Sequence, residues 1–302
     1  MRIKEVPDVA SALLAAARSH KSTRPTGWHQ SDHNACLRKS VIKRLLAEKF
    51  PSLIPGEEWL VDERTALMFL RGAGIGAFLS EHRNEEVFYA DGFGWCSIDR
   101  PWQDPNGREV PMELKTTRFS SAYPITEHEN YISQLATYVV KKARREQGGV
   151  ERDERYYGYI YALFEQGDYV VRKPEQRAFE FEFSGRELLV WEQELDQRHG
   201  HLEQSYRALE QRWESDPHFQ LEFEKLADYI PADVDFETLL PPVSEHYEWE
   251  CNKYDECPVK ALINCPGTSD NGRWGLPFVV ESESYVREHR VRKEPKPKKA
   301  KE

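Results

Sequence analysis

Two carboxylates and a lysine have a spacing that favours metal-dependent chemistry. Asp99 is followed, after thirteen residues, by Glu113-Leu114-Lys115. Side chains alternate between the two faces of a strand, so Glu113 and Lys115 share one face while Leu114 packs on the other. Two carboxylates brought together repel each other, and a divalent cation relieves that repulsion while it polarises a phosphate and lowers the pKa of bound water. Glu-x-Lys is also typical of an ordinary exposed cross-strand pair, and these residues alone leave that alternative open.

Lys115 and two residues of the next predicted helix suit the same chemistry. A lysine one strand period from the carboxylate can orient or deprotonate an attacking water, and a neighbouring metal lowers the pKa of its ammonium. Hard oxygen ligands with an open coordination shell suit Mg²⁺ or Mn²⁺. Gln134 and Tyr138 are four residues apart and share a helix face. The Gln134 amide can bond a metal-bound water or a phosphate, and Tyr138 can stack on a base; a surface polar pair is the alternative.

Four of the five cysteines form a second candidate constellation. Cys36 precedes a basic predicted helix, and Cys251, Cys257 and Cys265 cluster near the C-terminus in a C-x₅-C-x₇-C spacing. One early and three late thiolates are enough for a [4Fe–4S] cluster. A structural Zn²⁺ is the alternative cofactor, although zinc favours two tight C-x₂₋₄-C pairs; four unrelated buried cysteines are a further alternative. The fifth, Cys96, lies in a predicted strand and is expected in the core.

Composition excludes a membrane span and favours the cytoplasm. The 302 residues include 42 Lys+Arg and 52 Asp+Glu, a formal net charge of −10, and the mean hydropathy is −0.75. No run approaches the roughly 20 apolar residues that a membrane-spanning helix needs. Glu5 and Asp8 do not fit a signal peptide. Five cysteines without disulfide-like pairing fit a reducing compartment, so we expect a cytoplasmic protein with no membrane association.

Positive charge is concentrated locally. The residues that we predict to bind DNA form a basic band on the helix after the first cysteine: Arg38, Lys39, Lys43 and Arg44. A second basic run, at residues 141–145, extends the helix of Gln134 and Tyr138. Either can line a groove for a phosphate backbone, and solvated helix faces are the alternative. Residues 287–302 are rich in Pro and Lys, so we expect a disordered basic tail.

Hydrophobic periodicity and turn signals predict a mixed α/β fold around one central sheet. The predicted helices cover residues 8–20, 34–49, 62–85, 127–146 and about 185–213. The predicted strands cover residues 87–90, 93–99, 109–117, 156–164, 169–172 and 177–183. Asp91-Gly92 predicts a hairpin between the first two strands. Residues 216–242 are acidic and interrupted by prolines, and no element is assigned to them.

Taken together, these motifs resemble the RecB-like branch of the PD-(D/E)XK nuclease superfamily. The likeness is to members that join their ends through an iron–sulfur cluster, namely the CRISPR-associated RecB-like exonucleases and the nuclease domains of AddB and of Dna2-type helicase–nucleases. It covers roughly residues 31–140 and 249–266. The resemblance implies an α/β, restriction-endonuclease-like fold, in which a central mixed sheet is flanked by helices and the N- and C-terminal segments meet at the cluster.

The resemblance also implies roles for individual residues. Asp99 and Glu113 would bind Mg²⁺ or Mn²⁺, and Lys115 would be catalytic. Gln134 and Tyr138 would complete the catalytic site. The implied cluster ligands are Cys36, Cys251, Cys257 and Cys265. The family carries a metal-binding His on the helix before the meander, where this chain has Gly76, and we predict Glu81 or His82 as the substitute.

The expected division of the chain follows from these roles. Residues 1–60 form an N-terminal helical segment with the first cluster cysteine, 61–215 the nuclease core, 216–286 the cluster-binding segment and 287–302 the tail. The expected activity is metal-dependent hydrolysis of DNA phosphodiesters, as an exonuclease more than an endonuclease, in recombination, phage replication or CRISPR adaptation. The alternative is a catalytically impaired DNA-end-binding subunit of the same fold.

The expected substrate is DNA that is single-stranded or has free ends. The chain has no P-loop motif G-x-x-x-x-G-K-[ST], so any unwinding motor would be another polypeptide. A helicase, a recombinase and an integrase are the candidate protein partners.

Overall fold

The structure is a computed structural model that describes a large part of the chain. The described residues are 27–50, 86–90, 93–98, 100–104, 106–117, 121, 125–165, 167, 174–227, 230–242, 262–263 and 265. Several predictions concern other positions. Outside the described residues lie the helices at 8–20 and 62–85, the strand at 169–172, the tail at 287–302, and Gly76, Glu81, His82, Asp99, Cys251 and Cys257.

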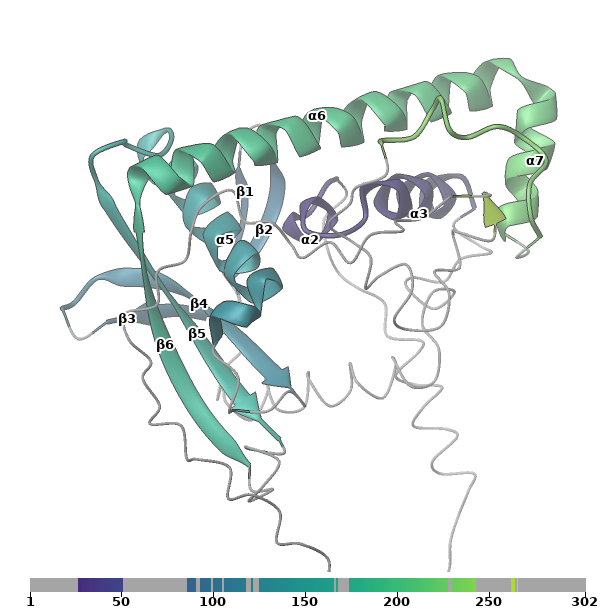
Figure 1. The fold of residues 1–302 in the computed structure, drawn as a ribbon. Helices are drawn as coiled ribbons and strands as arrows, with labels where there is room; N and C mark the ends of the chain where they lie inside the picture. The colour runs from purple at the N-terminus through teal and green to yellow at the C-terminus, as the bar shows by residue number, and fades with distance from the viewer. Residues whose placement is uncertain are drawn as a thin grey trace, which may run out of the picture.

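Four strands form a mixed sheet in the order β3-β4-β5-β6 (Figure 1). They are β3 (Arg100–Gln103), β4 (Glu109–Thr117), β5 (Arg155–Phe164) and β6 (Glu175–Ser184). β4 and β5 are parallel, with Glu113 opposite Ile160 and Lys115 opposite Ala162, while the other two pairs are antiparallel. Parallel neighbours need a crossover, which contains α5 (Glu129–Gln147). The predicted mixed α/β class and the strand at 109–117 are confirmed.

The chain before β3 forms a separate hairpin, so the described residues contain two sheets where one was predicted. β1 (Glu86–Ala90) and β2 (Gly94–Ile98) pair antiparallel. The other side of β2 is occupied at its start, because Trp95 N donates to the carbonyl of Trp28 at 2.7 Å and His29 bridges Trp95. β2 ends at Ile98 and β3 begins at Arg100, where the chain takes β4 as its new partner.

Helix α5 packs its apolar side into a core that includes both sheets. Ile132, Leu135 and Val139 on α5 are buried in one cluster with Ile160 on β5 and Ile98 on β2. The approach is close, since a Cβ at position 158 of β5 would lie 2.8 Å from Leu135 Cδ1. The helix ends at Gly148, whose φ of 81° lies in the left-handed region that glycine adopts without strain.

Helix α6 (Gly185–Ser215) is 31 residues long and connects two cores. It begins with a capping box, in which Ser184 accepts from the Glu187 amide and the Glu187 carboxylate accepts from the Ser184 amide. Its first half contributes Leu188, Trp191 and Leu195 to the core around α5. Its second half contributes Leu202, Tyr206 and Leu209 to a different core. Figure 1 shows α6 extending from the sheet side to α7. No helix in the described part of the chain is both long and apolar enough to cross a membrane.

The second core gathers the N-terminal and C-terminal parts of the described chain. Helix α3 (Leu37–Lys49), which lies within the helix predicted at 34–49, buries four apolar side chains at helical spacing: Leu37, Val41, Leu45 and Leu46. Helix α7 (Pro217–Ala227), which the sequence did not predict, adds Phe219 and Phe223. Leu262 and Ile263 are buried in the same core, and the Leu262 carbonyl accepts from the Ala232 amide at 3.1 Å.

A buried histidine ties the short helix α2 (Gln30–His33) to α6. His33 is fully buried, its Nδ1 lies 2.9 Å from the His29 carbonyl, and its Nε2 lies 3.1 Å from His199 Nδ1. Because a carbonyl only accepts, the proton of neutral His33 is on Nδ1, and Nε2 accepts from His199. Burial, together with the positive charges of Lys141 and Arg198, holds the pKa of His33 well below its usual value. Burial also lowers the pKa of His199.

Acid is therefore expected to weaken the contact of α2 with α6. Below the ordinary histidine pKa, the unfolded chain takes up a proton at His33 that the folded chain does not, so folding stability present above about pH 6.5 is lost as the pH falls. The expected loss between pH 7 and pH 5 is about 2 kcal/mol from His33. Urea unfolding at both pH values measures it.

Two variants separate this histidine from general acid effects. His33→Gln should be less stable than wild type at pH 7 but should lose less stability between pH 7 and pH 5. His218→Gln, at an exposed position on α7, should keep the wild-type pH dependence. Equal pH dependences in His33→Gln and wild type would contradict the assignment.

Candidate active site

The predicted site residues of β4 face helix α5 at its first turns. Glu113 is 1% exposed and the Lys115 side chain is 20% exposed. The Lys115 ammonium donates to Glu113 Oε1, and it also donates to Gln134 Oε1 at 2.7 Å. The period of two along β4 puts Glu113 and Lys115 on one face, as the sequence predicts, and the crossover brings Gln134 over them. Three of the predicted site residues are therefore in direct contact.

A chain of hydrogen bonds continues from Gln134 to β2. Gln134 Nε2 donates to the Tyr138 hydroxyl at 3.0 Å, and Gln30 Nε2 donates to the same oxygen at 2.9 Å. The Gln30 amide also bonds the Ser97 backbone, accepting from its N–H at 2.7 Å and donating to its carbonyl at 3.0 Å. The chain of contacts thus connects β4, α5, α2 and β2.

Tyr138 and Gln30 are both buried, which makes this network costly to interrupt. Tyr138 is 1% exposed and Gln30 is 8% exposed. Tyr138 is predicted from the sequence and Gln30 is not, because Gln30 lies more than one hundred positions from Tyr138 and no local spacing relates the two. The only signal for Gln30 in the sequence is an amide side chain at the start of a short helix.

One carboxylate oxygen of the site is suited to a cation. Glu113 Oε2 is buried and has no hydrogen-bond partner among the residues that the structure describes. A buried acceptor without a donor is costly, and a bound cation removes that cost. The Glu113 carboxylate therefore fits a hard divalent ion such as Mg²⁺ or Mn²⁺.

The other predicted metal ligands are not in the described residues. Asp99 lies between Ile98 of β2 and Arg100 of β3 in the sequence, and Arg100 pairs with Met112, the residue before Glu113. Glu81 and His82 also lie outside. Within the described ranges, no group of three or more His, Cys, Asp and Glu side chains is arranged to hold a metal ion.

The ring of Tyr131 borders the ammonium of Lys115 and is backed by the ring of His128. The ammonium lies 5.3 Å from the centroid of the Tyr131 ring, and the Tyr131 ring stacks on His128 with centroids 5.1 Å apart. Tyr131 is one helical turn before Gln134 on α5, so both residues present side chains to Lys115. A cation over an aromatic face is electrostatically favourable, and this contact helps to fix the lysine.

Two of the four predicted cluster cysteines are described, and both lie near the start of α3. Cys36 is the N-cap residue of α3. Cys265 packs against the core that α3 shares with α7, and Arg38 Nη1 lies 3.8 Å from its sulfur. Ligand sulfurs of iron–sulfur clusters accept hydrogen bonds, so an N–H donor at this position suits a cysteine that ligates a metal. Cys96 is fully buried in β2, as predicted for a core residue.

The predicted DNA-binding band on α3 divides into inward and outward residues. Arg38 is 3% exposed and pairs with Glu237, so it contributes to the interior rather than to a surface. Arg44 lies between the rings of Trp28 and Tyr206, 4.3 and 4.4 Å from their centroids. The two remaining residues of the band, Lys39 and Lys43, are half-buried.

The basic run on α5 serves packing rather than an open groove. Lys141 is fully buried and donates to the Phe93 carbonyl at 2.8 Å, and burial lowers its pKa to about 8. Lys142 pairs with Glu109 at 2.9 Å. Arg144 stacks on Phe93 and pairs with Glu192. The expectation that this run lines a phosphate groove is wrong for Lys141.

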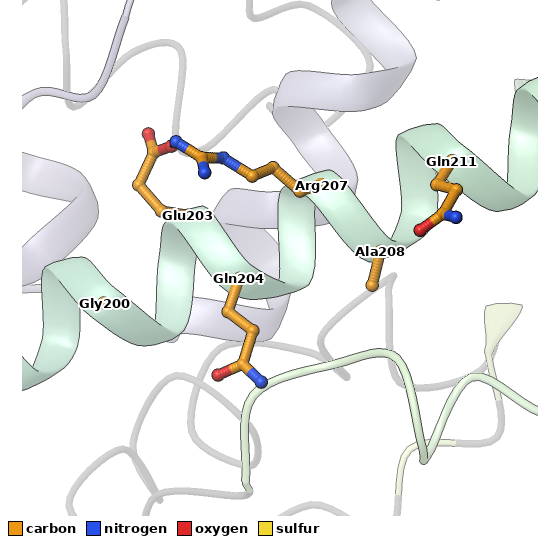
Figure 2. Close-up of a pocket in the computed structure, with 6 residues that line it drawn as sticks. All are labelled: Gly200, Glu203, Gln204, Arg207, Ala208 and Gln211. Atoms are coloured by element: carbon orange, nitrogen blue, oxygen red, sulfur yellow. The ribbon is translucent and has the colours of Figure 1, made fainter.

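The hollow shown in Figure 2 lies elsewhere, on the exposed side of α6. Its lining residues all belong to that helix: Gly200, Glu203, Gln204, Arg207, Ala208 and Gln211. Glu203 and Arg207 pair across it at 3.3 Å. None of the predicted site residues lines this hollow.

Comparison with known proteins adds little to this geometry. No family model matches the chain, and no curated protein matches it significantly. Among solved structures, the chain is similar to one described as "Crystal structure of SSO0001", with 14% identity and a TM-score of 0.35, over 62% of this chain and 85% of that one. A similarity this low carries no argument, so the site stands on its own residues.

Removal of the Tyr138 hydroxyl tests the buried network. Tyr138→Phe leaves the amides of Gln30 and Gln134 without a shared acceptor in a buried place, which is expected to cost about 1–3 kcal/mol of unfolding free energy. Tyr156→Phe is the matched control, since the Tyr156 hydroxyl also accepts two hydrogen bonds, from Gln147 and the Glu151 amide, but at the surface. Water can replace that hydroxyl, so the expected cost is below about 0.5 kcal/mol. Equal costs in urea unfolding would argue against the network.

Proposed function

We propose that the protein is a Mg²⁺- or Mn²⁺-dependent deoxyribonuclease of the PD-(D/E)XK type, acting on DNA ends as an exonuclease. The observation that supports this most directly is the pair of Glu113 and Lys115, with one carboxylate oxygen of Glu113 bonded to the ammonium and the other buried without a donor among the described residues. A purely structural ion pair would have no need for that second oxygen to remain unsatisfied.

In this proposal Glu113 and Asp99 hold the divalent ion, with Glu81 or His82 as a further ligand. When bound, the ion polarises the scissile phosphate and lowers the pKa of a coordinated water. Lys115 acts through its ammonium, which Glu113 and Gln134 fix in position through hydrogen bonds. A lysine held in this way can orient the attacking water and exchange a proton with it at Nζ.

Gln134 and Tyr138 act by holding Lys115 in place. Gln134 accepts from the ammonium and donates to the Tyr138 hydroxyl, so its amide orientation is fixed from both sides. Tyr131 covers the ammonium from α5. A positioned catalytic group needs a rigid surround, and the buried network from Lys115 to Ser97 supplies one.

Cys36, Cys251, Cys257 and Cys265 hold a [4Fe–4S] cluster in this proposal, with structural Zn²⁺ as the alternative. The cluster would connect the start of α3 to the C-terminal segment. Its support is that Cys36 and the 262–265 segment belong to the same part of the molecule, around the core of α3 and α7. The proposed location of the protein is therefore the cytoplasm, where a cluster of this kind is assembled and kept reduced.

DNA contact is assigned to the less buried basic residues of α3. Lys39 and Lys43 are the members of the predicted band that the structure leaves half-buried without enclosing them in the core. They would contact the backbone by charge, without sequence preference. The proposed pathways are recombination, phage replication and CRISPR adaptation, since each supplies DNA ends. The proposed protein partner of the nuclease is a helicase, a recombinase or an integrase.

An end-labelled DNA degradation assay tests the activity and its site. Wild type with Mg²⁺ or Mn²⁺ is expected to shorten DNA from an end, and Lys115→Ala and Glu113→Gln are each expected to lower the rate by at least about 100-fold. Labels at the 5′ and 3′ ends report polarity. Lys225→Ala, at a lysine on α7 that pairs with Glu222, is the matched control and should retain the wild-type rate.

Two outcomes would overturn the assignments. Metal-dependent degradation that survives both substitutions would overturn the site. Folded wild type that binds DNA ends without degrading them in either metal would replace the nuclease by the end-binding subunit. Circular dichroism and thermal melting of each variant exclude loss of folding as the cause of lost activity.

A further inference from the structure

Arg38 was predicted as a DNA-binding residue, but its guanidinium is enclosed by the protein. Its Nε donates to the Pro241 carbonyl at 2.6 Å, and its two terminal nitrogens each donate to one oxygen of Glu237 at 2.7 Å. Nη1 additionally contacts the sulfur of Cys265 at 3.8 Å. Among the described residues, the partners of this guanidinium therefore lie in the C-terminal part of the chain, while Arg38 itself is on the first turn of α3.

The pairing with Glu237 does not by itself explain why a charge is buried here. The side chain of Arg38 is 4% exposed, whereas that of Glu237 is 57% exposed. Desolvating a guanidinium is expensive, and an ion pair with an exposed carboxylate returns little of that cost. An apolar side chain would fill the same space at a lower cost. Two acceptors at this depth need an N–H donor: the Pro241 carbonyl and the sulfur of Cys265.

We propose that Arg38 is a positioning residue for the iron–sulfur cluster, donating an N–H···S hydrogen bond to the Cys265 ligand; this rests on the cluster of the proposed function. Glu237 and the Pro241 carbonyl hold the guanidinium plane, and the second N–H of Nη1 is directed at the sulfur. Arg38 follows Cys36 by two residues, so one turn of α3 carries a ligand and the donor to another ligand.

The consequences of such a donor are chemical as well as mechanical. A hydrogen bond to a ligand sulfur withdraws electron density from the cluster and raises its reduction potential. Second-shell partners also orient the ligand, and their loss typically weakens metal retention by about 10–100-fold. Arginine suits the position because its planar guanidinium can donate hydrogen bonds to a carbonyl, a carboxylate and a sulfur at once. A lysine ammonium on its flexible side chain does not hold three such acceptors in a fixed geometry.

The experiment uses the full chain, purified anaerobically, as wild type, Arg38→Gln, Arg38→Lys and Lys39→Gln. Three quantities are measured: iron per chain, the reduction potential by spectroelectrochemistry, and the rate at which a chelator removes iron. Arg38→Gln is expected to lose iron about 10-fold faster than wild type and to have a more negative potential. Arg38→Lys should lie between the two. Lys39→Gln, at the next position on the same turn, should match wild type.

Glu237→Gln separates this role from folding stability. It weakens the ion pair but leaves the N–H···S contact, so its melting temperature should fall while its potential stays that of wild type. If Arg38→Gln is insoluble, the comparison of Arg38→Lys with wild type decides, and an unchanged potential with unchanged iron retention overturns the proposal.

Cys265→Ala distinguishes failure of this inference from failure of the cluster itself. Wild-type iron content in Cys265→Ala, or a wild type that carries zinc and no iron, overturns the cluster and the inference with it. Loss of iron in Cys265→Ala, together with wild-type retention and potential in Arg38→Gln, overturns the role of Arg38 alone.

Discussion

The interaction on which the site depends is the ammonium of Lys115 held between a strand and a helix. Glu113 and Lys115 come from β4, and Gln134 comes from the crossover helix that a parallel β4–β5 pair requires. Partly buried charge is tolerated only where each donor has an acceptor, so the relative position of sheet and helix is constrained at this point. The parallel pairing therefore also serves the site, because it brings α5 across the face that carries both residues.

Helix α6 extends that constraint to the rest of the molecule. Its first half packs with α5 in the core beside the site, and its second half packs with α3 and α7 in the core that holds Cys265. A continuous helix of 31 residues is stiff, so the two cores are held at a fixed separation. The contact between buried His33 and half-buried His199 fastens α2 to this helix between the two cores.

The sequence predicted features that depend on local spacing and missed those that depend on distant partners. The helix at α3, the bounds of β4 and the shared face of Glu113 and Lys115 follow from periods of 3.6 and 2. α7 was missed because charged residues interrupt its aromatic side and because the helix begins at a proline, Pro217. Arg38 and Lys141 were assigned to surfaces, since a basic residue in a helix is usually exposed, and only the folded chain reveals the carbonyls and the sulfur that surround them.

The segment from Gln30 to Arg38 shows how few residues connect the two candidate centres. Gln30 bonds Tyr138 in the network of Lys115, His33 contacts α6, and Arg38 contacts Cys265 and Glu237. These contacts use side chains on two consecutive short stretches of helix, α2 and the first turn of α3, with Cys36 as the N-cap between them.

A shift of α3 relative to the C-terminal segment would therefore displace Gln30 unless the residues between the helices absorb it. Because Gln30 is held at both its amide oxygen and nitrogen by Ser97 and Tyr138, such a shift has a direct energetic cost in the site. The network of Lys115 and the surroundings of Cys265 are thus mechanically linked through these nine residues, whose sequence alone drew attention only to Cys36 and Arg38.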